Sequence, residues 1–154
     1  MNENQNLKVT KFHKGVYGII KKDNKMLLIK KARGPYTGLY DLPGGSPEDG
    51  ETPEQTLVRE VKEETNCDVI SCSFLEEKTI IFSNFTKESG KTGVLQHTGV
   101  LFVAQVNGMP TEQGDGLDSK GAVWRPISQL SSQNATPFVL YGIKVKKTNV
   151  LKRS

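Results

Sequence analysis

The sequence predicts an α/β fold, and three observations indicate it. Strand-like apolar segments precede a two-faced helix, further strand-like segments follow it, and a second helix is predicted near the C-terminus. These elements fall at residues 15–31 (two strands), 53–65, 68–85, 94–106 and 138–147. A chain of 154 residues with 35% hydrophobic side chains can fill one core. We therefore expect a single domain over residues 1–154, with flexible ends at 1–13 and 148–154.

Turn residues separate these elements. The Asp23-Asn24 pair suits a tight turn between the two leading strands. The Gly- and Pro-rich stretch at 32–41 predicts a loop that leads to the helix. After the strand at 94–106, which is the strongest strand signal in the chain, we expect a short strand at 122–125 and a helical turn at 127–130.

The helix at 53–65 has clear start and stop signals. Thr52 can cap the first turn, Pro53 suits the first helical position, and Gln55 completes a capping-box pattern. Asn66 tolerates the left-handed conformation in which a helix often ends. One side of the helix is apolar and is expected to face the core; it consists of Leu57, Val58, Val61 and the methyl group of Thr65.

Three carboxylates share a separate face of this helix. At about 100° per residue, Glu64 lies about 40° from Glu60 in one direction, and Glu63 lies about 60° from it in the other. Like charges this close repel unless a cation or a proton joins them. An oxygen-rich cluster suits Mg²⁺, Mn²⁺ or Ca²⁺. The cluster therefore indicates a divalent-metal site, and a solvated acidic helix face is the alternative that the cluster by itself leaves open.

The spacing around the carboxylates resembles the signature of the Nudix (MutT-like) hydrolase family. That signature is Gly, five residues, Glu, seven residues, then Arg-Glu-aliphatic-x-Glu-Glu-x-Gly-aliphatic. Here Gly45 is followed after five residues by Glu51, and after seven more by Arg59 and the three carboxylates, so every charged position is filled. Asn66 stands in place of the glycine, and Cys67 fills the last aliphatic place. On this resemblance we expect an α/β/α sandwich with a mixed central sheet.

The resemblance also implies an activity and a cofactor. Relatives are hydrolases that cleave a phosphoanhydride bond with Mg²⁺ or Mn²⁺, a cation that neutralises phosphate charge and lowers the pKa of bound water. By this resemblance Glu60 and Glu64 are the leading metal ligands, Glu63 shares a metal or orients water, and the Gly45 carbonyl adds a further oxygen. Arg59 is expected to pair with Glu51 and steady the loop against the helix.

The general base is left open by the resemblance. It comes either from the signature, where Glu63 or Glu60 is the candidate, or from an acidic residue in a later loop. The acidic residues of that loop are Glu112, Asp115 and Asp118. Asp118 stands in the approach to the strand of Trp124, where relatives often place an acid. Loop solubility is the alternative role for each of them.

Residues that could contact a substrate gather in the loop before the signature. Arg33 could reach phosphate oxygens, with a surface role as the alternative. Tyr36 and Tyr40 look free to stack on a ligand, whereas most other aromatic residues are expected in the core. His97 alternates within a long apolar strand, so it either points into the substrate groove or is a satisfied structural histidine. The expected substrate is a nucleoside diphosphate linked to another moiety, including a nucleoside triphosphate or a nucleotide sugar.

Charge is spread unevenly along the chain, whose net charge is +4. Residues 1–38 carry nine basic and two acidic side chains, whereas residues 39–83 carry three basic and eleven acidic ones. Basic residues of the first strands are therefore expected to meet the anionic part of the substrate. The basic C-terminal end is either solvated or makes a weak nucleic-acid contact. Two alternative functions stay open: an RNA 5′-end pyrophosphohydrolase and a nucleotide-binding regulator that lacks catalysis.

The remaining signals concern location and assembly. The first 15 residues lack the apolar core of a signal peptide, and no segment approaches the length of a membrane span. We expect a cytoplasmic protein with no membrane partner, as a monomer or a homodimer. Cys67 and Cys72 are too few for a zinc site and are expected to be reduced thiols.

Overall fold

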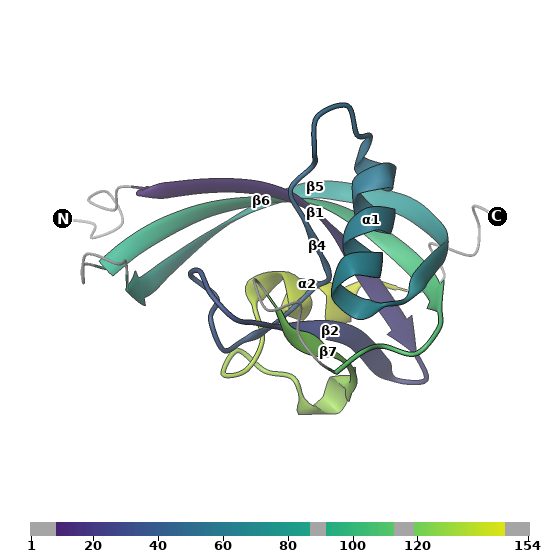
Figure 1. Ribbon diagram of the computed structural model, residues 1–154. Helices are drawn as coiled ribbons and strands as arrows, with labels where there is room; N and C mark the ends of the chain where they lie inside the picture. Colours follow the sequence, from purple (N-terminus) through teal and green to yellow (C-terminus); the bar gives the residue numbers. More distant parts are fainter. Residues whose placement is uncertain (1–8, 87–91, 113–118, 147–154) are drawn as a thin grey trace.

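A computed structural model of the chain describes residues 9–86, 92–112 and 119–146. The bounds of its elements are β1 Lys11–Lys22, β2 Lys25–Lys31, β3 Tyr40–Asp41, β4 Gly44–Gly45, α1 Pro53–Thr65, β5 Asp68–Thr86, β6 Thr92–Asn107, β7 Ser119–Pro126, the 3₁₀ turn η2 Ile127–Gln129, and α2 Pro137–Lys144. Figure 1 shows β1, β5 and β6 as long curved strands that extend well to one side of α1.

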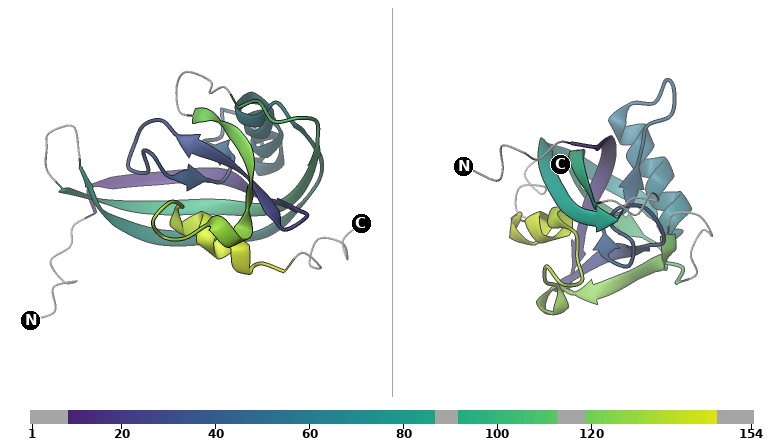
Figure 2. Two further views of the ribbon diagram at one scale, coloured as in Figure 1. Left: turned by 90° about the horizontal axis from the view of Figure 1, so that it is seen from below. Right: turned by 90° about the vertical axis from the view of Figure 1, so that its left-hand side faces the viewer.

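The strands form one mixed sheet. Its order is β3-β2-β1-β6-β5, with β4 paired to β1 and β7 paired to β2. β1 runs parallel to β6 from Lys11 opposite Leu95 to Ile20 opposite Ala104, whereas the other strand pairs are antiparallel. Figure 2 shows α1 and α2 on opposite sides of the sheet. The expected α/β/α sandwich with a mixed central sheet is confirmed.

The alternation of side chains along the strands divides the interior into two cores. Val16 and Ile20 of β1 pack with Leu57 and Val61 of α1 on one face. The side chains between them point to the other face, because successive residues of a strand alternate. There Tyr17, Ile19 and Leu101 pack with Phe138 and Val139 of α2. Both helices therefore bury their apolar sides against the same strands.

Most boundaries agree with the sequence. The turn falls at Asp23 and Asn24, whose φ values are 52° and 61°, and the long strands, β7 and the 3₁₀ turn lie close to where they were expected. The short strands β3 and β4 were not predicted, and β3 falls at the end of the expected loop at 32–41, because its two residues pair with β2. The expectation of a flexible end up to residue 13 is wrong, because β1 begins at Lys11 and pairs with β6 from there. α2 ends at Lys144, short of residue 147, and the expected end at 148–154 lies outside the described residues.

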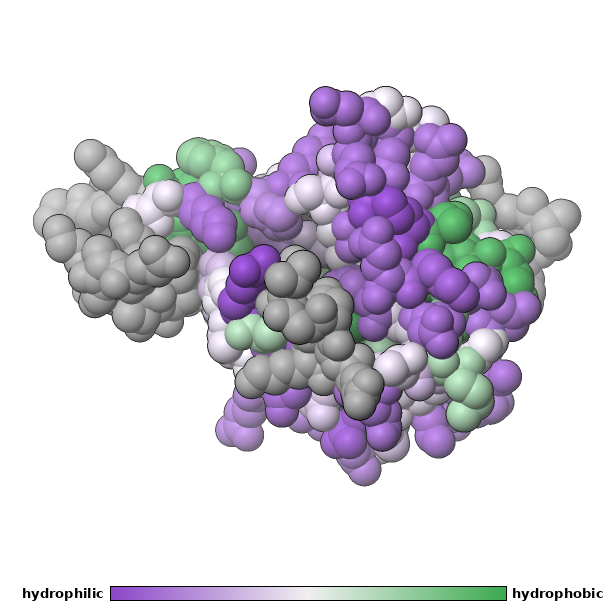
Figure 3. All heavy atoms as spheres, in the orientation of Figure 1, coloured by the Kyte–Doolittle hydropathy of each residue, from purple (hydrophilic) through white to green (hydrophobic). Residues whose placement is uncertain are grey.

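The apolar side of α1 is narrower than expected. Leu57, Val61 and Thr65 are buried, but Val58 is 46% exposed, so its expected burial is wrong. Hydrophilic side chains cover most of the outer surface of α1 in Figure 3, and hydrophobic residues come to the surface beside it. Among the described residues no helix has the length and apolar composition needed to cross a membrane.

Candidate active site

Local sequence signals set the position of the helix that carries the carboxylates. The Thr52 hydroxyl accepts a hydrogen bond from the Gln55 N–H, and the Gln55 side chain accepts one from the Thr52 N–H, so the predicted capping box is confirmed. Pro53 occupies the first turn, and Asn66 ends the helix with φ 65°. These contacts fix where the helix begins and ends, and therefore which carboxylates face the loop before it.

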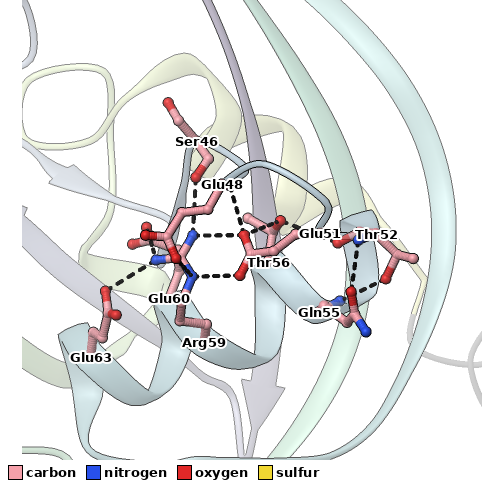
Figure 4. A network of polar contacts seen from close by, with 9 residues as sticks. All are labelled: Ser46, Glu48, Glu51, Thr52, Gln55, Thr56, Arg59, Glu60 and Glu63. Carbon is pink, nitrogen blue, oxygen red and sulfur yellow. Dashed lines mark hydrogen bonds and ion pairs between the residues drawn. The ribbon is translucent and has the colours of Figure 1, made fainter.

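Arg59 joins the helix to that loop. Its Nε donates to Glu51 Oε2 at 2.7 Å and its Nη2 to Glu51 Oε1 at 2.9 Å, which is a two-pronged bond (Figure 4). Nη2 also donates to the Ser46 carbonyl at 3.1 Å. The hydrogen bonds from Arg59 lower the pKa of Glu51 to about 2. The expected pairing of Arg59 with Glu51 is therefore confirmed.

The same guanidinium also holds two of the predicted metal ligands. Arg59 Nη1 donates to Glu60 Oε1 at 2.9 Å and to Glu63 Oε2 at 3.3 Å. The Glu60 side chain is largely shielded, whereas 56% of the Glu63 side chain is exposed. Arg59 therefore neutralises part of the negative charge on this face of the helix.

Glu64 points inward, which is unusual for a carboxylate. It is buried, and its Oε1 accepts a hydrogen bond of 2.8 Å from the Gly44 N–H. Burial raises the pKa of the Glu64 carboxyl well above its ordinary value, the Gly44 N–H opposes that shift, and nearby Glu60 adds to it. A buried carboxylate beside a second carboxylate favours a bound cation or a bound proton.

The two glycines of β4 let the carboxylates approach the backbone. A Cβ atom at Gly45 would lie 2.7 Å from the Glu60 carboxyl carbon. A Cβ atom at Gly44 would overlap the Val16 carbonyl oxygen, and Gly44 has φ 147°. Gly44 is therefore required for the pairing of β4 with β1, whereas Gly45 leaves room for the Glu60 carboxylate in its present position.

The donor atoms fit a hard divalent cation in their chemistry. Glu60 and Glu64 are carboxylates that line one cavity, Gly45 lies against Glu60, and oxygen ligands are those that Mg²⁺ and Mn²⁺ prefer. In the arrangement with Arg59 bound to Glu60 and Glu63, no three His, Cys, Asp or Glu side chains of the described ranges form a metal-holding group. Metal ligation by Glu60, Glu63 and Glu64 therefore stays a prediction.

A cavity of about 710 Å³ joins this acidic helix to basic residues. Glu60, Glu63 and Glu64 line it together with Gly45. Basic residues of β1, β2 and the following loop line it as well, namely Lys11, His13, Lys31 and Arg33, in addition to Arg59 of α1 and His97 of β6. Opposite charges on one cavity suit a ligand that carries both phosphate groups and metal ions.

The residues expected to contact a substrate have different outcomes. Arg33 lines the cavity. Tyr36 lines it too, but the expectation that its ring is free is wrong, because only 3% of Tyr36 is exposed. Tyr40 lies outside the cavity lining, and its ring packs under Lys30 and Arg125, with the cationic groups 5.4 Å and 5.3 Å from the ring centre.

The later-loop candidates for the general base are only partly described. Asp115 and Asp118 lie outside the described residues, so their roles stay predictions. Glu112 is exposed and does not line the cavity.

The structure adds cavity residues that the sequence did not single out. Asp41 is buried in the cavity wall, and its Oδ1 accepts hydrogen bonds from the Leu42 N–H and the Thr136 hydroxyl, both at 2.8 Å. Burial raises the pKa of the Asp41 carboxyl. Tyr17 also lines the cavity and is 5% exposed. In the sequence, Asp41 is a lone acidic residue before the signature loop, and Tyr17 lies in a glycine-rich strand; these features could have indicated the two residues.

The two alternatives predicted for His97 are combined in the structure, because the side chain lines the cavity and both ring nitrogens have hydrogen-bond partners. It is 2% exposed, lines the cavity, and shares hydrogen bonds with two tyrosine hydroxyls. Burial, with nearby His13 and Lys31, lowers the pKa of His97 to about 3, so its ring is neutral near pH 7.

Comparison with known proteins agrees with this site. A family profile described as the NUDIX domain matches residues 11–143. The ADP-ribose pyrophosphatase of Methanocaldococcus jannaschii is 60% identical over 50 residues, which are 32% of this chain and 30% of that protein. The 8-oxo-dGTP diphosphatase of Proteus vulgaris is 39% identical over 56 residues, which are 36% of this chain and 50% of that protein. The matched segments thus span half or less of these relatives.

Solved structures share the fold over much more of the chain. The MutT NUDIX hydrolase from Burkholderia pseudomallei has a TM-score of 0.61 at 22% identity and covers 87% of this chain and 97% of that one. A NUDIX hydrolase from Nitrosomonas europaea has a TM-score of 0.55 at 28% identity, with 87% of each chain covered. Because the family profile spans most of the sequence, and Gly45, Arg59 and the three helix carboxylates of the signature line one cavity, the chain belongs to the Nudix hydrolase family.

Proposed function

We propose that the protein is a Mg²⁺- or Mn²⁺-dependent pyrophosphohydrolase that cleaves a phosphoanhydride bond in a nucleoside diphosphate linked to another moiety. The observation that carries this proposal is the cavity, which joins the carboxylates of α1 to Lys31 and Arg33. The names of the two relatives described above support the substrate class, since ADP-ribose and 8-oxo-dGTP both contain a nucleoside diphosphate unit. We assign the function to one domain over residues 1–154.

We assign metal binding, phosphate binding and carboxylate positioning to different residues of the cavity. Glu60 and Glu64, with the Gly45 carbonyl, would hold the cation, which when bound neutralises phosphate charge and acidifies water. Lys31 and Arg33 bind phosphate oxygens from the cavity wall. Gly44 keeps the Glu64 carboxylate in place through its N–H.

Glu63 is the favoured general base among the carboxylates of α1. Its bond to Arg59 is the longer of the two at 3.3 Å, and its side chain is the most exposed of the three. It can therefore leave Arg59 to take a proton from water at a lower cost than Glu60, which Arg59 holds at 2.9 Å. Asp118 remains the alternative base from the later loop.

A panel of substrates tests the proposal. ADP-ribose, dGTP, 8-oxo-dGTP and NAD-capped RNA are each incubated with the protein and Mg²⁺ or Mn²⁺, and products are separated by chromatography. Reaction in ¹⁸O-labelled water then identifies the phosphorus that is attacked. We expect metal-dependent release of a nucleoside monophosphate from at least one compound. No turnover of any compound of the panel with either metal would overturn the proposal.

The alternative functions are outcomes of the same panel. Turnover of capped RNA but not of free nucleotides would favour the RNA 5′-end activity. Binding of ADP-ribose without turnover would favour a non-catalytic regulator. Removing residues 147–154 separates the proposed contact of the basic C-terminal end with RNA from catalysis on free nucleotides.

A further inference from the structure

Two tyrosines and a histidine form a buried hydrogen-bonded chain in the wall of the cavity. The Tyr36 hydroxyl lies 2.8 Å from His97 Nδ1, and the Tyr17 hydroxyl lies 2.8 Å from His97 Nε2. His13 Nε2 lies 3.1 Å from the same Tyr17 hydroxyl. A neutral imidazole has one donor and one acceptor, so both ring nitrogens of His97 are satisfied by the two hydroxyls. The metal-site and phosphate-binding roles above do not use these three side chains.

The sheet is built to hold these rings. Gly15 of β1 lies opposite Gly99 of β6, and a Cβ atom at Gly15 would overlap the Tyr17 hydroxyl. At Gly99, a Cβ atom would lie 3.0 Å from the Phe138 ring. Phe138 stacks on Tyr17 with ring centres 5.9 Å apart and meets His97 edge-on at 4.8 Å. The glycine pair thus leaves room for the rings, and α2 closes them in.

Tyr36 connects the packed rings of Tyr17, His97 and Phe138 to the loop that carries Arg33, a residue of the cavity lining. The loop between β2 and β3 is largely exposed at residues 33, 34, 37 and 38, whereas Tyr36 is buried and its ring meets Phe82 with centres 4.8 Å apart. Within the loop, the Gly38 N–H donates to the Lys31 carbonyl and the Leu39 N–H to the Tyr36 carbonyl. The Tyr36 side chain therefore ties this exposed loop to β6.

We propose that Tyr36 and His97 are positioning residues: through the Tyr36–His97 hydrogen bond they hold the 33–38 loop so that Arg33 meets the phosphate groups of the substrate. Arg33 lies three residues before Tyr36 and lines the same cavity. This inference rests on the proposed hydrolase function, because it assigns the phosphate contact of that site to an anchored loop. The role is one of placement, since neither Tyr36 nor His97 needs to react.

The first test is Tyr36→Phe, which keeps the ring and removes only the hydroxyl. We expect KM for ADP-ribose with Mg²⁺ to rise about fivefold while kcat stays nearly unchanged, because one net hydrogen bond is lost from substrate positioning. Amide hydrogen exchange at Gly38 and Leu39 should become faster. Tyr141→Phe in α2, whose ring lies over Lys78 away from the cavity lining, is the matched control and should change neither quantity.

A double-mutant cycle separates positioning from a general structural effect. Arg33→Ala should raise KM by itself, and Tyr36→Phe should add nothing further in that background, because its effect acts through Arg33. His97→Gln, the second variant, should show the same dependence on Arg33. If Tyr36→Phe or His97→Gln raises KM by the same factor with and without Arg33, or leaves KM unchanged, the positioning role is refuted.

The two proposals fail in distinguishable ways. If the wild-type protein hydrolyses neither ADP-ribose nor any other compound of the panel, both proposals fail. If it hydrolyses one of them and the cycle is additive, the hydrolase function stands and only the positioning role is lost. The cycle is then run on the compound that turns over, with the same variants and the same control.

Discussion

The Glu64 carboxylate accepts a hydrogen bond of 2.8 Å from the Gly44 N–H, twenty positions earlier in the chain. Glu64 is only 6% exposed, so its charged form is stabilised by this donor and would be stabilised further by the predicted metal ion. The bond also joins α1 to β4, which pairs with β1. One contact therefore connects the predicted metal site to the central sheet.

Glu64→Gln tests the catalytic importance of this carboxylate. The amide can still accept the Gly44 N–H bond, but it cannot hold a hard cation as a carboxylate does. We expect metal-dependent turnover to fall by at least about a hundredfold while the melting temperature is preserved or rises, since a buried charge is removed. Nucleotide release and thermal melting measure the two effects. Glu54→Gln, on the exposed first turn of α1, is the matched control; turnover retained in Glu64→Gln contradicts the assignment.

Gly45→Ala tests the close approach of Glu60 to β4. The added methyl would meet the Glu60 carboxyl at 2.7–2.8 Å, so the carboxylate must move. A shift of this size at a catalytic group is expected to lower kcat/KM by about a hundredfold. Stability should change by less than about 1 kcal/mol, because the group that moves is a side chain at the cavity. Steady-state kinetics together with urea unfolding checks both expectations.

Gly44→Ala, at the neighbouring residue, is expected to affect mainly stability, whereas Gly45→Ala is expected to affect mainly activity. Here the methyl would overlap the Val16 backbone carbonyl, and φ 147° is unfavourable for any L side chain. Since backbone cannot move aside easily, we expect the free energy of unfolding to fall by about 3 kcal/mol or more. Urea unfolding of the two alanine variants side by side measures it. Equal losses of stability in both would mean that β4 is more adaptable than its pairing indicates.

His97 predicts a pH dependence of stability. Burial, with nearby His13 and Lys31, lowers its pKa from 6.5 to about 3, so between these values the unfolded chain binds the extra proton. Stability therefore falls as pH decreases below 6.5, by up to about 1.4 kcal/mol per pH unit. We expect the urea midpoint of the wild type to drop between pH 7.5 and 5.0 by more than that of His97→Gln. Comparing the two proteins removes the common contributions of Asp41 and Glu64; parallel curves would show that His97 does not contribute.

Asn66 tests the departure from the family signature at the end of α1. Its φ is 65°, a left-handed conformation that costs most L residues about 1–2 kcal/mol but is accessible to asparagine and glycine. Asn66→Ala should lower the free energy of unfolding by about 1 kcal/mol, whereas Asn66→Gly should leave it unchanged or slightly higher. Thermal melting measures the difference. An alanine variant as stable as the glycine variant would show that the helix ends differently.

The sequence by itself determined the helix that bears the carboxylates. Thr52, Gln55 and Asn66 mark its ends by contacts with near neighbours, and the pairing of Arg59 with Glu51 spans only eight residues. Such local rules act over a few residues, so they can be read without knowing the fold. The alternation of apolar residues likewise located the long strands.

Only the tertiary structure decided which residues complete the cavity. Tyr17 meets His97 across eighty residues because β1 and β6 pair in parallel, and Tyr36 reaches the same histidine from a loop. The exposure of Val58 and the burial of Glu64 also depend on how far the sheet extends under α1 and where β4 lies. Helical periodicity assigns each residue an angle around the helix axis, but burial and hydrogen bonding depend on what the rest of the chain places at that angle.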